Sequence, residues 1–214
     1  MEPSARRPLK VRDTVLAQRI AQRLSRTSLT PNRISLLSVV FALCTAWCFW
    51  LVQADPARTL WLLAAALFIQ LRLLCNLFDG MVAVEGGKHT PAGELYNDMP
   101  DRVADVLILV AAGYACPLPW GVELGWGAAV LAVMTAYVRT LSASIGAPVD
   151  FRGPMAKQQR MAALTLACLC GTVEGFLSGT PLYSLTLALG VIVSGSVLTL
   201  VRRTLAAWHF LEER

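Results

Sequence analysis

Residues 60–105 read LWLLAAALFIQLRLLCNLFDGMVAVEGGKHTPAGELYNDMPDRVAD. The first part of this stretch is an apolar run of about 20 residues, the length a helix needs to cross a bilayer. The second part is rich in acids, amides and glycines. Ionisable groups beside or inside membrane helices are costly and usually mark function. The stretch therefore predicts a membrane helix that ends in a polar site.

The whole chain is too apolar for an ordinary soluble protein. Hydrophobic residues make up 56% of the 214 positions and charged residues 15%, with a mean hydropathy of +0.56. Soluble domains carry about 25% charged residues. Six stretches approach or reach the length of a membrane span: Ile34–Gln53, Leu60–Phe78, Val103–Val122, Leu124–Ile145, Met161–Ser178 and Pro181–Val201. We therefore expect an all-α integral membrane protein with six transmembrane helices.

The distribution of positive charge predicts the orientation of these helices. Of the 19 lysines and arginines, 18 precede the first span, lie in or beside the even-numbered connections, or follow the last span. Arg58 alone lies in a connection on the opposite side. Cytoplasmic loops carry the excess of Lys and Arg. Both termini should therefore be cytoplasmic, in the inner membrane if the protein is bacterial.

The N-terminal arm, residues 1–33, predicts an amphipathic helix at the membrane interface. At about 100° per residue an apolar stripe is flanked by arginines: Leu9, Leu16, Ile20 and Leu24, with Arg12, Arg19, Arg23 and Arg26. Such a helix suits an anionic leaflet. The alternative is a basic tail that only fixes topology. The membrane accounts for these charges, so no nucleic-acid partner is expected.

Thr30 and Pro31 should then begin the first span as N-cap and first helical residue.

The polar segment after the second span predicts a divalent cation site. Asn76 and Asp79 are three residues apart and share a helix face. Gly86-Gly87 should break that helix, and Thr90-Pro91 should start the next. On the next helix one arc of about 100° carries five oxygen-bearing side chains: Glu94, Asn97, Asp98, Asp101 and Asp105. Mg²⁺ or Mn²⁺ suits carboxylate, amide and phosphate oxygens. The alternative is a solvated loop whose acids neutralise nearby arginines.

A second polar cluster lies on the same predicted side of the membrane. Arg139 lies low in the fourth span, and Lys157 and Arg160 share a face where the fifth span begins. We expect these cations to bind a diphosphate or a phosphate on the acceptor. The alternative is ordinary flanking charge that follows the positive-inside rule.

Residues 76–101 resemble the motif of the CDP-alcohol phosphotransferase (phosphatidyltransferase) family. That motif is D-x2-D-G-x2-A-R-x8-G-x3-D-x3-D, and this chain has N-x2-D-G-x2-A-V-x8-G-x3-N-x3-D. All spacings are kept, and five of the eight positions are identical: Asp79, Gly80, Ala83, Gly93 and Asp101. The six-span layout, the basic arm and the Thr-Pro-Asn entry into the first span also look like this family.

The resemblance implies an activity and a role for each matching residue. Family members exchange CMP on a CDP-linked substrate for an alcohol and form a phosphodiester. The resemblance makes Asp101 the general base. Metal ligands would be Asn76, Asp79, Asn97, Asp98 and Asp101, holding one or two Mg²⁺ or Mn²⁺ ions. The CDP group would meet Asp79, Gly80, Ala83, Lys88 and Gly93. A homodimer with its site open to the cytoplasm is also implied.

Three positions depart from the family motif. Asn76 and Asn97 stand where the family has aspartates, and Val84 replaces an arginine. Because an amide brings no negative charge, we expect weaker metal binding, with one tight ion rather than two. Asp98 or Asp105 would supply the missing charge, and Lys88 would replace the lost arginine near the diphosphate.

The sequence thus predicts phosphatidyl transfer from CDP-diacylglycerol to a polar alcohol with release of CMP. Residues 1–33 form the arm, and residues 34–214 form the six-helix catalytic domain. Three alternatives stay open at this stage. They are transfer from CDP-choline or CDP-ethanolamine to diacylglycerol, a catalytically degenerate relative that binds CDP-lipid, and a transporter that couples cations to intramembrane carboxylates.

Overall fold

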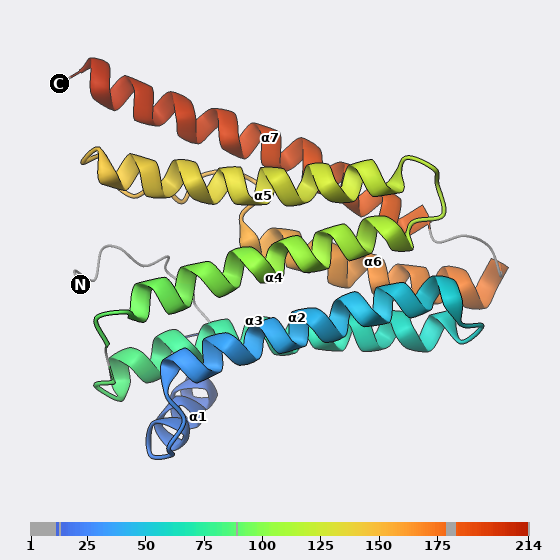
Figure 1. Cartoon of the computed structure of the whole chain (residues 1–214), viewed down its shortest axis with the longest axis horizontal. Coiled ribbons are helices and arrows are strands. Elements are labelled where there is room, and N and C mark those ends of the chain that lie inside the picture. Colours follow the sequence, from blue (N-terminus) through green and yellow to red (C-terminus); the bar gives the residue numbers. More distant parts are fainter. Residues whose placement is uncertain (1–11, 13, 89, 179–182, 214) are drawn as a thin grey trace.

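The computed structural model describes residues 12, 14–88, 90–178 and 183–213. Across these residues the chain is helical and contains no strand. One helix is short and six are long, and the long helices run side by side (Figure 1). Their bounds are α1 Val15–Ser25, α2 Pro31–Ala54, α3 Arg58–Glu85, α4 Gly93–Ala115, α5 Gly121–Ser144, α6 Lys157–Ser178 and α7 Tyr183–Glu212.

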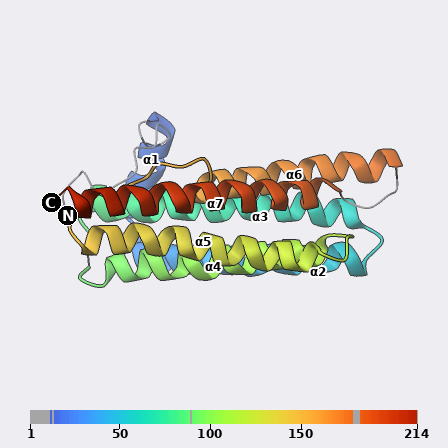
Figure 2. The same ribbon diagram turned by 90° about the horizontal axis from the view of Figure 1, so that it is seen from above.

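The six long helices form a closed ring. Neighbouring helices contact one another in the order α2, α4, α5, α7, α6 and α3, and α3 returns to α2. Seen from above, α2, α4 and α5 form one row, and α3, α6 and α7 form the other (Figure 2). Small residues let the helices approach closely. At the α4–α5 crossing, a β-carbon on Gly113 would lie only 2.7 Å from the α-carbon of Gly125.

Five of the described helices are long and apolar enough to cross a membrane: α2, α3, α5, α6 and α7. The all-α membrane class predicted from the sequence is therefore supported. The remaining long helix, α4, has 23 residues but carries charges through its first half: Glu94, Asp98, Asp101, Arg102 and Asp105. The sixth span and the side on which the termini lie stay predictions.

The polar segment is more helical than the apolar pattern predicts. The second predicted span ends at Phe78, yet α3 continues to Glu85. The third begins at Val103, yet α4 starts at Gly93. The apolar run ends where the first charged side chains appear, whereas the backbone hydrogen bonds of the helix continue through these turns. The predicted break is present, because Gly86 caps α3 and Gly87 has a φ of +60°.

The N-terminal helix forms as predicted, but a different face contacts the protein. Ala17 and Ala21 of α1 pack against Leu77 and Met81 of α3, whereas Leu16 is 69% exposed. Small side chains allow the helix to lie close to α3. Of the predicted stripe, Leu16 thus points away from α3, whereas Leu24 packs against the cluster that contains Cys75 and Val82 of α3. The stripe member Leu9 lies outside the described residues.

Thr30 and Pro31 begin α2 as the sequence predicts. The Thr30 side chain accepts a hydrogen bond from the amide of Arg33, and Pro31 occupies the first turn. The start of α2, the second half of α3, the first half of α4 and the start of α6 meet at one end of the bundle. The polar side chains of these segments form the candidate site.

Candidate active site

The Asp79 carboxylate lies between α3 and α2. It is 4% exposed. Ser35 of α2 donates a hydrogen bond of 2.7 Å from its hydroxyl to Oδ2, and the amide of Gly80 donates to Oδ1. Buried carboxylates require such partners. The sequence singled out Asp79 but not Ser35, because a serine near a helix start has many possible roles.

The Asp101 carboxylate joins three helices. Asn76 of α3 donates a hydrogen bond of 2.8 Å to Oδ1, and Lys157 of α6 donates to Oδ2. Asp101 is 5% exposed. Asp79, Asp101 and Lys157 are close enough for their charges to interact. The structure thus brings together Asn76, Asp79 and Asp101 of the predicted cation site and Lys157 of the second polar cluster.

Asp105, one turn further along α4, has a different environment. Its two carboxylate oxygens accept hydrogen bonds from Arg72 at 2.6 Å and from Arg160 at 2.8 Å. These three side chains are almost completely buried. Asp105 is therefore paired with arginines rather than open to the site. Arg160, predicted to bind a phosphate or the acceptor, instead donates from Nη2 to Asp105 and from Nη1 to Thr135 and to the Met155 carbonyl.

Arg72 is not predicted from the sequence as a residue of the site. In the sequence it contributes only to the charge distribution that predicts orientation, although it lies in an apolar run. A cation within a membrane span is itself a signal of function. Its partner Asp105 lies 33 positions later, so the pairing is decided by how the ring of helices places α3 and α4 relative to each other.

A more exposed ion pair lies at the edge of the site. Arg139 of α5 approaches Asp98 of α4 at 2.9 Å, and Arg102 lies 3.6 Å from the same carboxylate oxygen. The Arg139 and Asp98 side chains are partly accessible to solvent. Asn97 is exposed on the neighbouring face of α4. Asp98 and Asn97 thus lie at the exposed edge of the site, which we call its entrance.

The small motif residues leave room around the backbone. A β-carbon on Gly80 would lie 3.9 Å from Nη2 of Arg12, which comes from the N-terminal arm. A β-carbon on Gly93 would lie 3.4 Å from the Thr90 hydroxyl. Ala83 is half-buried on α3. The sequence predicts Arg12 only as one of the arginines that flank the apolar stripe, so its place beside Gly80 is a finding of the structure.

Lys88 contacts the end of the N-terminal helix region. Its amine donates hydrogen bonds to the carbonyl oxygens of Thr27 at 2.8 Å and Leu29 at 3.3 Å. These hydrogen bonds hold the loop between α3 and α4 against the segment between α1 and α2. Lys88 is thus held beside the site, although its amine is directed at backbone carbonyls.

The connection before α6 is fixed by α7. Thr199 accepts a hydrogen bond from the amide of Met155, and Arg203 donates to the carbonyls of Arg152 and Thr135. Gly153 has a φ of +124°, and a β-carbon there would lie 2.5 Å from Thr199. This anchoring determines where Lys157 begins α6.

The donor set around Asp79 and Asp101 suits a hard divalent cation. Carboxylate and amide oxygens are the ligands such ions prefer. Within the described residues, however, no three Asp, Glu, His or Cys side chains are grouped closely enough to hold a metal by themselves. Among the described residues, Asp79 and Asp101 would be the carboxylate donors to such an ion.

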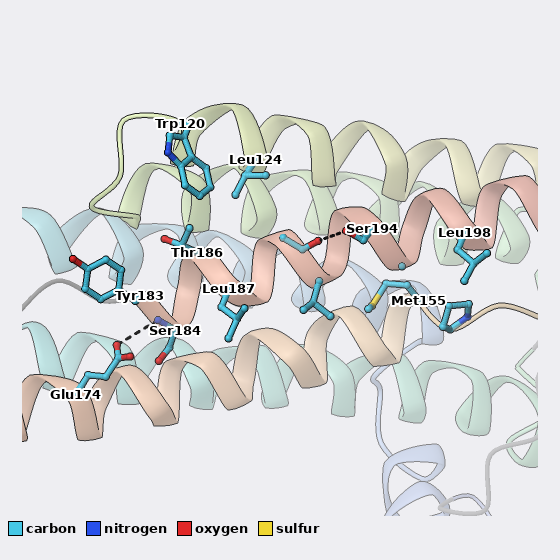
Figure 3. A pocket seen from close by; sticks show the side chains of 14 residues that line it. Trp120, Leu124, Met155, Glu174, Tyr183, Ser184, Thr186, Leu187, Ser194 and Leu198 are labelled. Atoms are coloured by element: carbon cyan, nitrogen blue, oxygen red, sulfur yellow. Dashed lines mark hydrogen bonds between the residues drawn. The ribbon is translucent and has the colours of Figure 1, made fainter.

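An apolar groove of about 940 Å³ lies among α5, α6 and α7. Figure 3 shows Trp120 and Tyr183 towards one end and Met155 and Leu198 towards the other. The backbone of Met155 bonds to Thr199 and Arg160. The groove therefore extends from beside the polar site along the membrane-spanning helices.

Comparison with known proteins agrees with the fold and the motif. The family model for CDP-alcohol phosphatidyltransferase matches residues 28–207. No curated protein matches the sequence significantly. Structures of phosphatidylinositol phosphate synthase PgsA1 from Mycobacterium tuberculosis are similar in fold. With CDP-DAG bound, PgsA1 has a TM-score of 0.70 and 20% identity, over 89% of this chain and 92% of that one. PgsA1 in complex with manganese and citrate has a TM-score of 0.73 and 20% identity, over 89% of this chain and 88% of that one.

Proposed function

Because the chain belongs to the CDP-alcohol phosphatidyltransferase family, whose enzymes are phosphotransferases that form a phosphodiester, we propose that it transfers a phosphatidyl group from CDP-diacylglycerol to a polar alcohol. CMP is the second product. The observation that carries the proposal is the convergence of Asn76 and Lys157 on the buried Asp101 carboxylate. The related PgsA1 structure with CDP-DAG bound supports the choice of donor.

In the proposed reaction Asp101 is the general base. The acceptor hydroxyl gives its proton to the Asp101 carboxylate while its oxygen attacks the phosphatidyl phosphorus. A new phosphorus–oxygen bond forms, the bond to the CMP oxygen breaks, and CMP leaves with the bonding electrons. Asn76 and Lys157 hold the carboxylate in place before the reaction. Positioning and charge neutralisation account for most of the catalysis in this class of reaction.

The residues that would hold a divalent ion are Asp79 and Asp101, with Asn76, Asn97 and Asp98 as further oxygen donors. A bound Mg²⁺ or Mn²⁺ ion would neutralise charge on the diphosphate and on the departing CMP. PgsA1 in complex with manganese supports this choice of metal. Because Asn97 and Asp98 lie at the entrance and amides carry no charge, we propose one tight ion rather than two.

Cations on three sides of the acidic residues would bind the anionic parts of the substrates. Lys157 lies beside Asp101, Arg12 lies beside Gly80, and Arg139 is partly exposed at the entrance. We propose that Lys157 and Arg12 bind the diphosphate, with Lys88 nearby, and that Arg139 meets the acceptor. Arg160 is buried, so its role in this scheme is indirect.

The apolar groove suits an acyl chain of the donor lipid. Its lining is almost wholly apolar, and its Met155 end adjoins the polar site. A lipid whose diphosphate lies between Asp79 and Lys157 would have its chains in the bilayer beside these helices. We propose that one chain occupies this groove.

We also propose six spans, cytoplasmic termini and a homodimer. The length of α4 and its contacts with α2 and α5 on either side support a sixth span. The positive charge at one side of the chain supports a cytoplasmic site. The homodimer rests on the family resemblance.

The proposed function is tested by CMP release from purified protein. CDP-diacylglycerol and Mg²⁺ or Mn²⁺ are supplied with a pool of glycerol-3-phosphate, serine, inositol, inositol phosphate, choline and glycerol. Metal-dependent release that is absent from an Asp101→Ala control supports the proposal, and dividing the pool identifies the acceptor. Release only from CDP-choline with diacylglycerol would reverse the substrate pairing. No release from either pair would contradict an active enzyme.

A further inference from the structure

We infer that Arg72, Asp105 and Arg160 form a buried positioning unit that fixes the Asp101–Lys157 pair. The inference rests on the proposed role of Asp101 as base. None of the three belongs to the family motif quoted above, and each comes from a different helix, α3, α4 and α6. The exposed fraction of each residue is 2% or less.

Asp105 is the centre of the unit. Its Oδ1 accepts a hydrogen bond from Nη2 of Arg72 at 2.6 Å, and its Oδ2 accepts one from Nη2 of Arg160 at 2.8 Å. One carboxylate of α4 thus connects two guanidinium groups that project from α3 and α6. Charge-assisted bonds of this kind are short and directional. The relative positions of α3, α4 and α6 are therefore set at this point.

Arg72 connects the unit to Asp101. The nitrogen that binds Asp105 also donates a hydrogen bond to the backbone carbonyl of Asp101 at 3.3 Å. It lies 3.6 Å from Oδ1 of the Asp101 side chain. Asp101 precedes Asp105 by one helical turn, so a single guanidinium contacts both turns. Arg72 thereby limits rotation of α4 and movement of the Asp101 carboxylate.

Arg160 connects the same unit to Lys157. The two residues are three apart at the start of α6 and share a helix face. Nη1 of Arg160 also donates to the carbonyl of Met155 at 3.0 Å, in the connection that leads into α6. Asp105 therefore fixes the turn that carries Lys157 as well as the turn that carries Asp101. The distance between base and lysine depends on this one carboxylate.

Stability alone does not account for the unit. Replacing a buried ion pair by apolar side chains of similar size is often neutral or stabilising. Within the described residues, Nε and Nη1 of Arg72 are buried with no hydrogen-bond partner. Such groups are a cost in a folded protein. A role in positioning Asp101 and Lys157 accounts for the presence of two buried arginines at this place.

The test compares wild type with Arg72→Lys and, as control, Arg58→Lys, which is exposed at the opposite end of the bundle. Lysine keeps the charge beside Asp105 but lacks the guanidinium fork that also contacts Asp101. The turnover number per folded molecule is measured with the folded fraction taken from size-exclusion chromatography. The labelling rate of the Lys157 amine by acetic anhydride is followed by mass spectrometry, with Lys88 as internal reference.

For Arg72→Lys we expect kcat to fall by about 10- to 100-fold, with KM for CDP-diacylglycerol little changed and Lys157 labelled faster than in wild type. A wild-type kcat together with a wild-type labelling rate of Lys157 would overturn the inference. A fall in yield at unchanged kcat per folded molecule would show a merely structural role and would also overturn it. If wild type itself releases no CMP, the proposed function fails, and the Lys157 labelling rate alone decides the inference.

A second variant covers the case in which Arg72→Lys does not fold. The triple substitution Arg72→Met, Asp105→Leu and Arg160→Met removes all three charges but keeps the bulk, so it should remain folded. We expect the same loss of kcat and faster labelling of Lys157. Wild-type turnover in this variant would overturn the inference.

Discussion

Lys157, at the start of α6, donates a hydrogen bond to the carboxylate of Asp101 in α4, 56 positions earlier in the chain. If Asp101 is the base, Asp101→Asn should remove proton acceptance while keeping the size of the side chain. We expect CMP release to fall about 100-fold or more. The assay is metal-dependent CMP release from CDP-diacylglycerol.

The control for this variant is Glu123→Gln, which removes a carboxylate from an exposed position at the start of α5. It should retain wild-type turnover. Near-normal activity in Asp101→Asn would exclude Asp101 as the base.

Asn76→Asp should make the stability of the protein depend on metal. The Asn76 amide donates to Oδ1 of Asp101, and a carboxylate at position 76 would place two negative groups there with no donor between them. We expect a lower Tm than wild type in chelator and a larger rise in Tm when Mn²⁺ is added. Thermal unfolding in detergent measures both values.

Asn97→Asp is the matched comparison, because Asn97 is exposed near the entrance. This substitution should leave the Tm in chelator near that of wild type. Tighter Mn²⁺ binding by Asn97→Asp would show that charge at this position limits metal affinity, and unchanged binding would argue against a charge deficit there.

Arg12→Ala should weaken binding of the CDP substrate. Arg12 lies beside Gly80, and the next turn of α3 carries Val84 in place of the motif arginine. Positions 80 and 84 share a helix face, so an arginine at position 84 can reach the same space. We expect KM for CDP-diacylglycerol to rise in Arg12→Ala and to recover in Arg12→Ala/Val84→Arg.

Arg19→Ala, an exposed change on α1, controls for the general effect of losing a basic residue from the arm. An equal rise in KM for Arg19→Ala would attribute the effect to membrane charge rather than to the site.

Gly190→Phe should partly fill the apolar groove. A β-carbon at Gly190 meets no atom within 4 Å, so the larger side chain can be accommodated. We expect a higher KM for long-chain CDP-diacylglycerol and little change for a short-chain analogue. Leu36→Phe, at an exposed position of α2 away from the groove, should change neither value. Equal effects of Gly190→Phe on both lipids would contradict the proposed acyl site.

Gly153→Ala should destabilise the protein. Its φ of +124° disfavours any side chain, and a β-carbon would overlap Thr199. We expect a loss of about 1 kcal/mol or more, seen as a lower Tm. Gly127→Ala in α5 is the control, since a β-carbon there meets only Val193 at 4.0 Å. A Tm equal to wild type for Gly153→Ala would contradict this role of Gly153.

Much of the site could be predicted because its residues are close in sequence. Asn76 and Asp79 share one turn of α3, and Asn97 to Asp105 share one face of α4. Helical periodicity and the motif spacing were enough to select them. Ser35, Arg12 and Arg72 were not selected for the site, because each meets its partner through packing between helices. The Thr30-Pro31 capping pattern also correctly predicted the start of α2, because capping is a local interaction.

The sequence by itself determined the helical membrane class, the break at Gly86-Gly87 and the acidic motif, since apolar length, glycine breaks and residue spacing are local properties. The sequence predicts the next connection at position 123, whereas the structure has it at residues 116–120. The tertiary structure decided which charges meet. Asp105, which the spacing placed on the same arc as Asp101, is paired with Arg72 and Arg160, while Asp101 faces Asn76 and Lys157. Spacing along one helix gives the face of a side chain, but only the arrangement of the helices in the ring brings side chains of α3 and α6 to that face of α4.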